Sequence, residues 1–459
     1  MKHLMAIILA AGEGKRMKSK NSKVIHKACG RPVIEWVYKA VEDSGISETV
    51  LVVGHRADQV KECMGDRVKY TTQEKQLGTG HAVMQAEKYL KDKEGIVVVL
   101  CGDTPLITAD TITEVIKYHK NSMNSATVIT ALLDDPTGYG RIVRDRHDNV
   151  VKIVEHRDAN DEEKAIQEIN SGMYCFTIGD LLHSLKELNN NNSQGEYYLT
   201  DTLEILIKSG RKVGAFIAMD PEEILGINDR IQLAKAERIL RDRSIESLML
   251  AGATFIDPSG TYVDAEVKIG MDSIIYPGTS LEGKTVIGEN CMIGPNTRIV
   301  SSEIGDGVEI MNSVVVESSV GDETKIGPFA YIRPGSRLGK NVKIGDFVEV
   351  KKSVIGDKTK IPHLSYVGDA EIGKNVNLGC GVVVVNYDGK KKNKTVVGDN
   401  AFVGCNSNLV SPVVVGENSY VAAGSTITEE VPEFSLAIAR SKQVNKENWV
   451  NKKGMQRNK

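Results

Sequence analysis

The sequence predicts an α/β protein in three parts: a Rossmann-like domain, a helical connector and a parallel β-helix of hexapeptide repeats. Short β-branched runs alternate with helical patterns at first, a charged helical pattern follows, and an aliphatic residue followed by Gly then recurs about every six residues. At 459 residues the chain is too long for one core. We expect a domain at 1–227, a linker at 228–256, a β-helix at 257–440 and a tail at 441–459.

Composition narrows the class of protein. The net charge of −3 gives no general reason to expect nucleic acid or an anionic membrane as a partner. No apolar run approaches the roughly 20 residues of a membrane span. The seven cysteines are scattered without a C-x-x-C pair, which indicates a reduced protein without a zinc site. We therefore expect a cytoplasmic protein that acts on small molecules.

The first domain should be built on a mostly parallel sheet. The runs MAIILA, TVLVVG and IVVVLCGD read as buried strands, with helices expected from about Pro32 and near Ala82 to Leu90. The first run leads into a Gly-rich loop rather than a cleavage site, so we interpret it as a strand and not as a signal peptide. Ligands of such sheets lie beyond the carboxyl ends of the strands.

The stretch LAAGEGKRM, which follows the first strand, indicates phosphate binding. Its two glycines let the backbone approach a ligand, and Arg16 adds positive charge that Lys23 can reinforce. The spacing is not that of a Walker A loop, and Met17 stands where the Rossmann fingerprint requires a third Gly. A plain strand-to-helix turn is the alternative.

The stretch CGDTPL, which follows a later strand, places Asp103 where a metal ligand would serve. Mg²⁺ is usually held by one or two carboxylates together with substrate phosphates. The alternative is a helix N-cap formed by Asp103 or Thr104. Five further stretches, QEKQLGTGHA, GYGRI, IVEH, EINSGMY and GINDR, are each by themselves most typical of turns.

The connector is predicted as one amphipathic helix. Apolar residues fall near helical spacing and Gly252 can end it, the apolar positions being Ile231, Ala234, Ile239, Leu240 and Ile245. A peripheral helix of the first domain is the alternative. Its polar face is rich in Arg, Lys and Glu.

The repeat that follows fits neither an amphipathic helix nor an alternating strand. From Gly270 to Gly416 the glycines are spaced by about six residues or multiples of six. Most of them follow Ile, Val or Leu. One aliphatic residue per hexapeptide points inward, and burying it contributes roughly 1.5–3 kcal/mol. A single rung cannot cover its own apolar face, so the rungs must stack.

Several features suggest that this half is more than a scaffold. His363 is its only histidine and lies in IPHLSYVGD, where we expect a loop to interrupt the rungs. Imidazole suits general-base chemistry at neutral pH. The cations Arg333, Lys351 and Lys392 would suit a sugar phosphate. The run VVVVNYDGKKKNKT lacks the hexapeptide Gly, and such insertions often bind ligands. A structural histidine and a solvated polar face are the alternatives.

Taken in order, LAAGEGKRM, QLGTGHA, GDTPL, GYGRI, IVEH, EINSGMY and GEYYLTD resemble the nucleotidyltransferases that make nucleotide-diphosphate sugars. The chain as a whole resembles the bacterial bifunctional N-acetylglucosamine-1-phosphate uridyltransferases / glucosamine-1-phosphate acetyltransferases. The resemblance implies a left-handed β-helix, a homotrimer, Mg²⁺, and UTP and acetyl-CoA as co-substrates. It also implies a role in peptidoglycan precursor synthesis.

The resemblance implies roles in the first domain. Uracil and ribose would be held by Leu9, Ala10, Ala11 and Gly12, the triphosphate by Arg16 and Lys23, and the polar edge of uracil by Gln73, Gly78 and Thr79. N-acetylglucosamine would be held by Gly140, Glu155 and Asn170, and Mg²⁺ by Asp103 and Asn228, of which Asn228 would also contact the nucleotide sugar. Cys101 stands where many relatives would have Tyr.

The resemblance also implies roles in the β-helix. His363 would be the catalytic base, oriented by Glu349. Glucosamine phosphate would be bound by Arg333, Lys351, Tyr366, Asn377 and Lys392, and acetyl-CoA by Cys380, Asn386, Tyr387, Cys405, Ala423 and Arg440. The Asn386 amide could stabilise an oxyanion. Cys380 and Cys405 stand where Ala and Ser are expected. A sugar-phosphate nucleotidyltransferase with an inert β-helix, and a non-catalytic sugar-nucleotide sensor, are the competing hypotheses.

Overall fold

The computed structural model describes residues 3–192 and 194–455, and the chain divides into two compact units, Met1–Arg241 and Asp242–Lys459. The boundary falls inside helix α9 (Arg230–Leu250), which confirms the predicted helix. Ala236 and Leu240 of this helix pack in an apolar cluster of the first unit, whereas Ile245 belongs to the core of the second. The two ends of the helix are thus stabilised by different cores.

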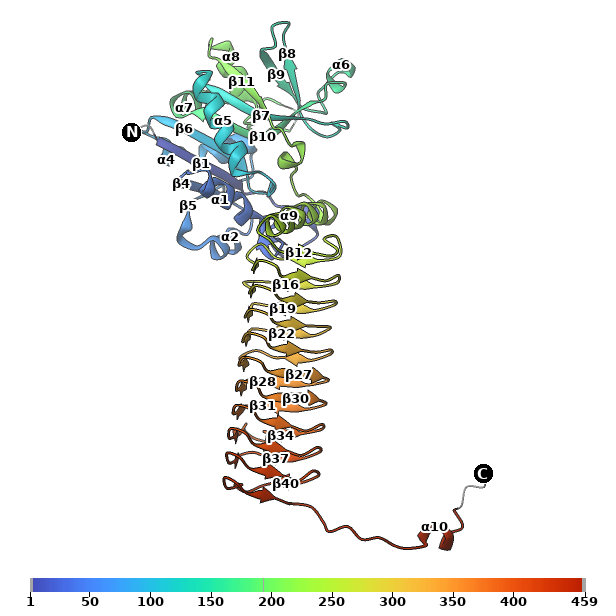
Figure 1. Ribbon diagram of the computed structural model, residues 1–459. Coiled ribbons are helices and arrows are strands. Elements are labelled where there is room, and N and C mark those ends of the chain that lie inside the picture. Colours follow the sequence, from blue (N-terminus) through green and yellow to red (C-terminus); the bar gives the residue numbers. More distant parts are fainter. Residues whose placement is uncertain (1–2, 193, 456–459) are drawn as a thin grey trace. The chain divides into compact units, whose positions relative to one another are not determined.

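The first unit is built on one nine-stranded sheet, coloured mainly blue and green in Figure 1. Its main path runs β11 (Val213–Ile217), β7 (Ala126–Leu132), β10 (Glu168–Thr177), β6 (Gly95–Cys101), β1 (His3–Ala10), β4 (Glu48–Val53) and β5 (Lys69–Thr72), with β8 (Arg141–Arg144) and β9 (Val150–Val154) off this path. Strands β6, β1, β4 and β5 are mutually parallel, as predicted. Strand β10 runs antiparallel to both of its main-path neighbours.

Helices cover both faces of this sheet, because its central strands are apolar on both sides. One face packs against α1 (Val33–Asp43), α2 (Ala57–Met64) and α5 (Ala109–Asn121), and the other against α3 (Thr79–Met84), α4 (Glu87–Leu90), α7 (Ile178–Glu187) and α8 (Asp201–Lys208). The helix predicted near Ala82 to Leu90 is therefore two short helices with a break between them. The remaining short elements are α6 (Asp161–Lys164), β2 (Lys27–Ala28), β3 (Arg31–Pro32) and the 3₁₀ turns Lys15–Met17, Lys23–Ile25, Gly65–Arg67 and Pro221–Ile224.

The second unit is a stack of short parallel strands in three sheets, visible as the yellow-to-red column of rungs in Figure 1. From β12 to β40, neighbouring strands of a sheet are three elements apart in the chain, so each rung contributes one strand to each sheet; the last pair of the first sheet, β39 and β41, is two elements apart. The inward residue of most rungs is Ile, Val or Leu, and these form one continuous buried core. This is the parallel β-helix that the hexapeptide repeat predicts.

The three sheets are distinguished here as the first, second and third face of the β-helix. The first face comprises β12 (Thr254–Phe255), β15 (Ile274–Ile275), β18 (Met292–Ile293), β21 (Glu309–Ile310), β24 (Lys325–Ile326), β27 (Lys343–Asp346), β30 (Lys360–His363), β33 (Asn377–Leu378), β36 (Phe402–Val403), β39 (Tyr420–Val421) and β41 (Leu436–Ala437). The second comprises β13 (Tyr262–Val263), β16 (Ser280–Glu282), β19 (Arg298–Val300), β22 (Val314–Val316), β25 (Tyr331–Ile332), β28 (Glu349–Lys351), β31 (Tyr366–Gly368), β34 (Val383–Val385), β37 (Asn408–Val410) and β40 (Thr426–Ile427). The third comprises β14 (Lys268–Ile269), β17 (Val286–Ile287), β20 (Glu303–Ile304), β23 (Ser319–Val320), β26 (Arg337–Leu338), β29 (Val354–Ile355), β32 (Ala370–Ile372), β35 (Thr395–Val397) and β38 (Val413–Val415).

One of the two predicted interruptions is confirmed and the other is wrong. A loop separates β34 from β35 and contains an isolated bridge between Tyr387 and Lys392. No loop interrupts the rungs at His363, which is the last residue of β30 and keeps its register with β27. The chain then turns at Leu364, whose φ of 45° is left-handed. His363 thus stands at a corner of an intact rung.

The C-terminal segment adds one short helix, α10 (Trp449–Lys452), beyond the last strand of the first face. Among the described residues, the chain forms no helix with the length and apolar content that a membrane crossing needs.

Candidate active sites

Two adjoining pockets lie where β1 and β6 end. The first, of about 280 Å³, is lined by Leu9, Ala10, Ala11, Gly12, Lys23, Val24, Gln73, Gln76, Gly78, Thr79, Ala82, Cys101, Asp103 and Glu196. Nine of the residues predicted to bind nucleotide or metal are in this lining. We call it the nucleotide pocket. It lies beyond the carboxyl ends of parallel strands, as the topology predicts.

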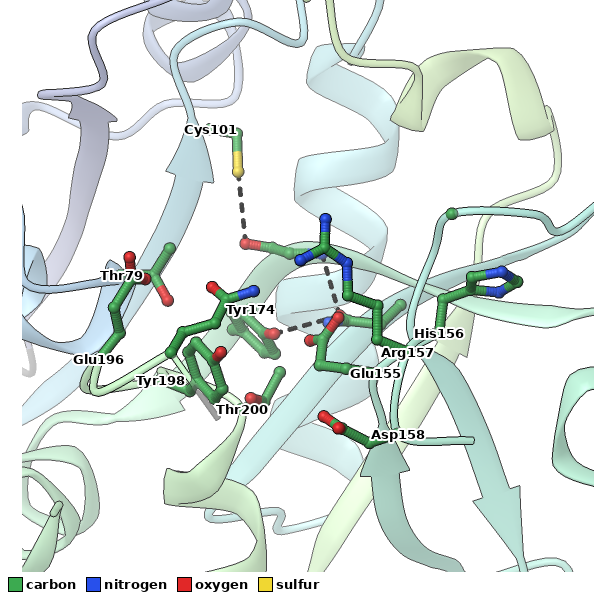
Figure 2. Close-up of a pocket in the computed structure, with 14 residues that line it drawn as sticks. Thr79, Cys101, Glu155, His156, Arg157, Asp158, Tyr174, Glu196, Tyr198 and Thr200 are labelled. Atoms are coloured by element: carbon green, nitrogen blue, oxygen red, sulfur yellow. Dashed lines mark hydrogen bonds between the residues drawn. The ribbon is translucent and has the colours of Figure 1, made fainter. Parts of the chain in front are cut away.

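The second pocket, of about 470 Å³, shares Thr79, Cys101 and Glu196 with the first. We call it the sugar pocket; it is lined further by Gly138, Glu155, His156, Arg157, Asp158, Asn170, Gly172, Tyr174, Gln194, Tyr198 and Thr200. Figure 2 shows its labelled polar side chains, with Glu155, Tyr174 and Tyr198 among them. Two ligands placed in the two pockets would meet at the shared wall.

Hydrogen bonds to Asn170 fix part of the wall of the sugar pocket. The Asn170 Oδ1 accepts from the Tyr174 hydroxyl at 3.1 Å and from the Gly172 N–H at 2.9 Å (Figure 2). Burial raises the pKa of the Glu155 carboxyl, and the nearby Asp158 and Asp201 raise it further. Gly140 is not in the lining, but it supports the pocket because its carbonyl accepts from the Asn170 N–H at 2.9 Å.

Gly78 fits its place for a steric reason. It has a φ of +103°, and a Cβ there would come within 2.5 Å of the Tyr197 carbonyl oxygen. The adjacent Gln73 is buried and donates from Nε2 to the Gly78 carbonyl at 3.0 Å. These contacts constrain the backbone on the side of the nucleotide pocket where we predict that the uracil edge is read.

Three predicted residues converge at the mouth of the nucleotide pocket. The Lys23 ammonium forms an ion pair with Asp103 and donates to Asn228 Oδ1 at 3.2 Å. The Ile227 N–H donates to the Asp103 carbonyl at 2.8 Å, which fixes the segment that carries Asn228. Arg16 is exposed on the turn Lys15–Met17 and lines neither pocket. The structure thus joins Asp103, Asn228 and Lys23 but leaves Arg16 apart.

Sequence reasoning assigned no role to several residues of the sugar pocket. Arg157, Asp158, Glu196, Tyr198 and Thr200 all line it. Three of these residues lie in the motif GEYYLTD, so the sequence did mark this segment. Nothing in the motif by itself indicates that any of its residues binds a sugar. Cys101 lines both pockets, and burial, followed by the charge of Asp103, raises the pKa of its thiol to about 12.

The second candidate site surrounds His363 on the β-helix. The register pairs Asp346 with His363 across β27 and β30, and the Asp346 Oδ1 lies 2.5 Å from His363 Nδ1. The expectation that Glu349 orients His363 is wrong. Glu349 starts β28 on the second face and forms an ion pair with Arg333 at 2.6 Å. The left-handed corner at Phe347 separates the two carboxylates onto different faces.

A column of equivalent positions runs along this corner of the β-helix. Continuing the register from Asp346 and His363 through neighbouring rungs leads to Cys380, Cys405 and Ala423. The backbone ladder repeats at each step, as in Asn406 N–H to the Cys380 carbonyl and Gly424 N–H to the Cys405 carbonyl, both 2.8 Å. Three residues predicted to contact acetyl-CoA therefore follow the predicted base on successive rungs. Arg440 lies nearby, since a Cβ on Gly424 would be 3.8 Å from its Cδ.

A polar cluster on the second face contains other predicted residues. Asn386 Nδ2 donates to Asp369 at 2.5 Å and to the Tyr366 hydroxyl at 3.4 Å, and Lys351 Nζ pairs with Asp369 at 3.3 Å. Gly368 permits this packing, because a Cβ there would lie 2.4 Å from the Tyr366 hydroxyl and 2.8 Å from Asn386.

Two ammonium groups face each other in this cluster. Lys392, from the loop after β34, approaches Lys351, and that cation lowers the pKa of Lys392. The pKa of the buried partner Lys351 is raised, because its ammonium is paired with the Asp369 carboxylate at 3.3 Å. Two adjacent cations repel unless an anion lies between them. The cluster is therefore suited to a phosphate dianion.

Two other predicted residues have looser ties to this cluster. The Tyr387 hydroxyl donates to the Gly389 carbonyl at 2.8 Å within its own loop. Asn377 begins β33 and pairs in register with Lys360 on the first face. Their roles stay predictions.

Comparison with known proteins identifies both halves. The nucleotidyl transferase family matches residues 5–221, and the bacterial transferase hexapeptide family matches 266–301, 317–352 and 394–429. The bifunctional protein GlmU of Acetivibrio thermocellus is 68% identical over 457 residues, covering 100% of this chain and 99% of the relative. The chain belongs to the GlmU family.

Other members of the GlmU family match as fully. The bifunctional protein GlmU of Caldanaerobacter subterraneus subsp. tengcongensis is 59% identical and that of Geobacillus sp. (strain WCH70) is 54% identical, covering 98% and 99% of this chain and the same shares of the relatives. As a GlmU-family member, the chain is a bifunctional transferase of the UDP-N-acetylglucosamine pathway. Its first unit is the nucleotidyltransferase, and its left-handed β-helix is the hexapeptide acetyltransferase.

Proposed function

We propose that the chain acetylates glucosamine-1-phosphate at the His363 site and then transfers UMP from UTP to the N-acetylglucosamine-1-phosphate at the two adjoining pockets. The observation that supports this most directly is the presence of a candidate site in each unit. The first unit has adjoining pockets for two ligands, and the β-helix has an imidazole held by a carboxylate and, on its second face, a polar cluster that contains Lys351 and Lys392.

At the β-helix site, His363 Nε2 accepts a proton from the sugar ammonium. The freed amine nitrogen attacks the thioester carbon of acetyl-CoA and the carbon–sulfur bond breaks. One proton passes from His363 to the departing coenzyme A sulfur, and the second proton that the nitrogen loses as the amide forms goes to solvent. Lys351, Lys392 and Arg333 bind the sugar phosphate. Asn386 is positioned by Asp369, and the Nδ2 hydrogen that makes the long 3.4 Å contact with the Tyr366 hydroxyl turns to the oxyanion. Cys380, Cys405, Ala423 and Arg440 line the path of the coenzyme.

At the paired pockets, an oxygen of the sugar phosphate attacks the α-phosphorus of UTP in line and pyrophosphate leaves. Positioning and charge neutralisation dominate this chemistry, because the protein forms no covalent bond to the phosphoryl group. Gln73 and Gly78 hold the uracil edge, Lys23 and Arg16 neutralise the triphosphate, and Glu155 and Asn170 hold the sugar. The shared wall at Thr79 brings the two ligands together.

The donor set at Asp103 fits Mg²⁺. A carboxylate and an amide oxygen converge on a single cation, the Lys23 ammonium, so both can reach one positive charge. The described residues include no group of three His, Cys, Asp or Glu suited to a metal, so the remaining ligands would be phosphate oxygens and water. When bound there, Mg²⁺ would neutralise charge on the phosphates of UTP.

A homotrimer is the assembly we propose for this β-helix. Phe329, Phe347 and Leu364 occupy one corner on three successive rungs, each 58–59% exposed and each in the left-handed region. Bulky apolar residues are costly there, whereas Asn and Gly hold the equivalent corners of other rungs. These three side chains form an exposed apolar stripe next to His363 and adopt an unfavourable backbone conformation. Both features are explained if the stripe packs against a neighbouring copy of the chain. Sedimentation of the purified chain tests this assembly.

Assays of both half-reactions test the proposed function. With acetyl-CoA and glucosamine-1-phosphate, we expect coenzyme A release detectable by a thiol reagent. With UTP, Mg²⁺ and N-acetylglucosamine-1-phosphate, we expect pyrophosphate release. A chain that released pyrophosphate but no coenzyme A would be a single-activity nucleotidyltransferase with a β-helix scaffold.

We predict that iodoacetamide modifies Cys405 before the buried Cys29, Cys175 and Cys291, because Cys405 is exposed. The adduct should block acetyl transfer and leave uridylyl transfer unchanged, and acetyl-CoA should slow the labelling. Peptide mapping by mass spectrometry follows the site. Cys405→Ser is the matched control and should retain acetyl transfer after treatment. Labelling of Cys405 at the same rate with saturating acetyl-CoA would contradict its place at the coenzyme site.

A further inference from the structure

His363 has one charged partner on its own corner column. It ends β30, and the neighbouring strand β27 ends with Asp346 directly opposite in the register. The Asp346 Oδ1 lies 2.5 Å from His363 Nδ1, and the Leu364 N–H donates to the Asp346 carbonyl at 2.9 Å. The strand pairing and the side-chain hydrogen bond therefore both place Asp346 against His363.

The contact determines which nitrogen of His363 can accept a proton. A carboxylate only accepts hydrogen bonds, so the Nδ1 beside it must carry the hydrogen. The Nε2 is then the nitrogen with a free lone pair. A carboxylate at this position also stabilises the imidazolium that forms when Nε2 takes a proton.

We propose that Asp346 is a positioning residue for acetyl transfer: it holds His363 with Nε2 available to the sugar amine and stabilises the charged ring. The inference rests on the proposed role of His363 as the base. It deepens that role by naming the residue that sets the tautomer.

Other groups around His363 do not supply this function. On the following rung the equivalent position is Cys380, which is uncharged as a thiol. Glu349 lies on the second face of the β-helix and forms an ion pair with Arg333. Lys343 and Lys360 start the paired strands β27 and β30 and carry no negative charge. Among the described neighbours in the strand register, Asp346 is the carboxylate that reaches the ring.

The state of Asp346 agrees with this role. Its hydrogen bond to His363 lowers the pKa of the carboxyl, so Asp346 is ionised throughout the pH range in which imidazole titrates. The carboxylate therefore keeps its charge on both sides of the imidazole transition, and any pH effect that depends on it reports on His363.

Asp346→Asn tests the proposal, because it keeps the size of the side chain and removes its charge. We expect kcat for acetyl transfer to fall about 10- to 100-fold, by analogy with the cost of removing the hydrogen-bond partner of a metal-ligating histidine. KM for glucosamine-1-phosphate should change little. The acidic limb of the kcat/KM profile should move to lower pH, since an amide no longer favours the protonated ring.

Glu349→Gln is the matched control, a charge removal three residues away on a different face. It frees Arg333 and should change KM for the sugar phosphate, while the acidic limb stays in place. Asp346→Glu should recover part of the lost kcat.

An Asp346→Asn enzyme with the wild-type kcat and acidic limb would overturn the proposal. A fall in kcat with an unmoved limb and a lowered unfolding temperature would also overturn it, because that pattern is structural. If His363→Ala retained acetyl transfer, the proposed base itself would be wrong. An inactive His363→Ala beside a fully active Asp346→Asn would refute only the positioning role.

Discussion

Replacing His363 with alanine should lower acetyl transfer by about 10²–10⁴-fold, the usual contribution of a general base. The imidazole stands at a corner of an intact rung and its side chain is 57% exposed, so its removal creates no cavity in the β-helix core. Uridylyl transfer should remain at the wild-type rate, because the paired pockets belong entirely to the first unit. Separate assays of coenzyme A release and pyrophosphate release measure the two effects.

Lys360→Ala is the matched control for this variant. Lys360 starts the same strand as His363 and is exposed, but it has no part in the proposed chemistry. Both activities should survive. Loss of both activities in His363→Ala, or of neither, would contradict the assignment of two separate sites.

Asp103→Asn should nearly abolish uridylyl transfer and leave acetyl transfer intact. The variant keeps the shape of the side chain but removes the carboxylate that faces Lys23 and that we expect to bind Mg²⁺. The fold should persist, because the Asp103 backbone carbonyl still accepts from the Ile227 N–H. Pyrophosphate release as a function of Mg²⁺ concentration measures the loss, and circular dichroism checks the fold.

Asp110→Asn serves as the control, since Asp110 is an exposed acid in the first turn of α5 with no pocket role. It should behave as the wild type. A wild-type rate for Asp103→Asn at ordinary Mg²⁺ concentrations would show that this carboxylate is not the metal ligand.

Much of the fold was predictable because its signals are local. The strand MAIILA and the loop after it are contiguous in sequence, so their role at a strand end followed from the order of residues. The antiparallel β10 was not predictable, because a strand's direction in a sheet depends on where distant strands lie. The residues of GEYYLTD likewise carry no local signal for a role, since only the folded chain brings Glu196 to the wall shared by the two pockets.

The sequence by itself determined the β-helix and singled out His363 as its candidate base. An aliphatic residue every six positions has one way to be buried, and that repeat sets three faces per turn. Only the tertiary structure decided that Asp346, not Glu349, meets His363. The contact joins two neighbouring rungs, and the number of residues per rung varies. Asp346 and His363 are 17 residues apart in the sequence, whereas Asn375 and Asn400, which are hydrogen-bonded across a later pair of rungs, are 25 residues apart. A change of one residue in a rung would move a different side chain opposite the imidazole.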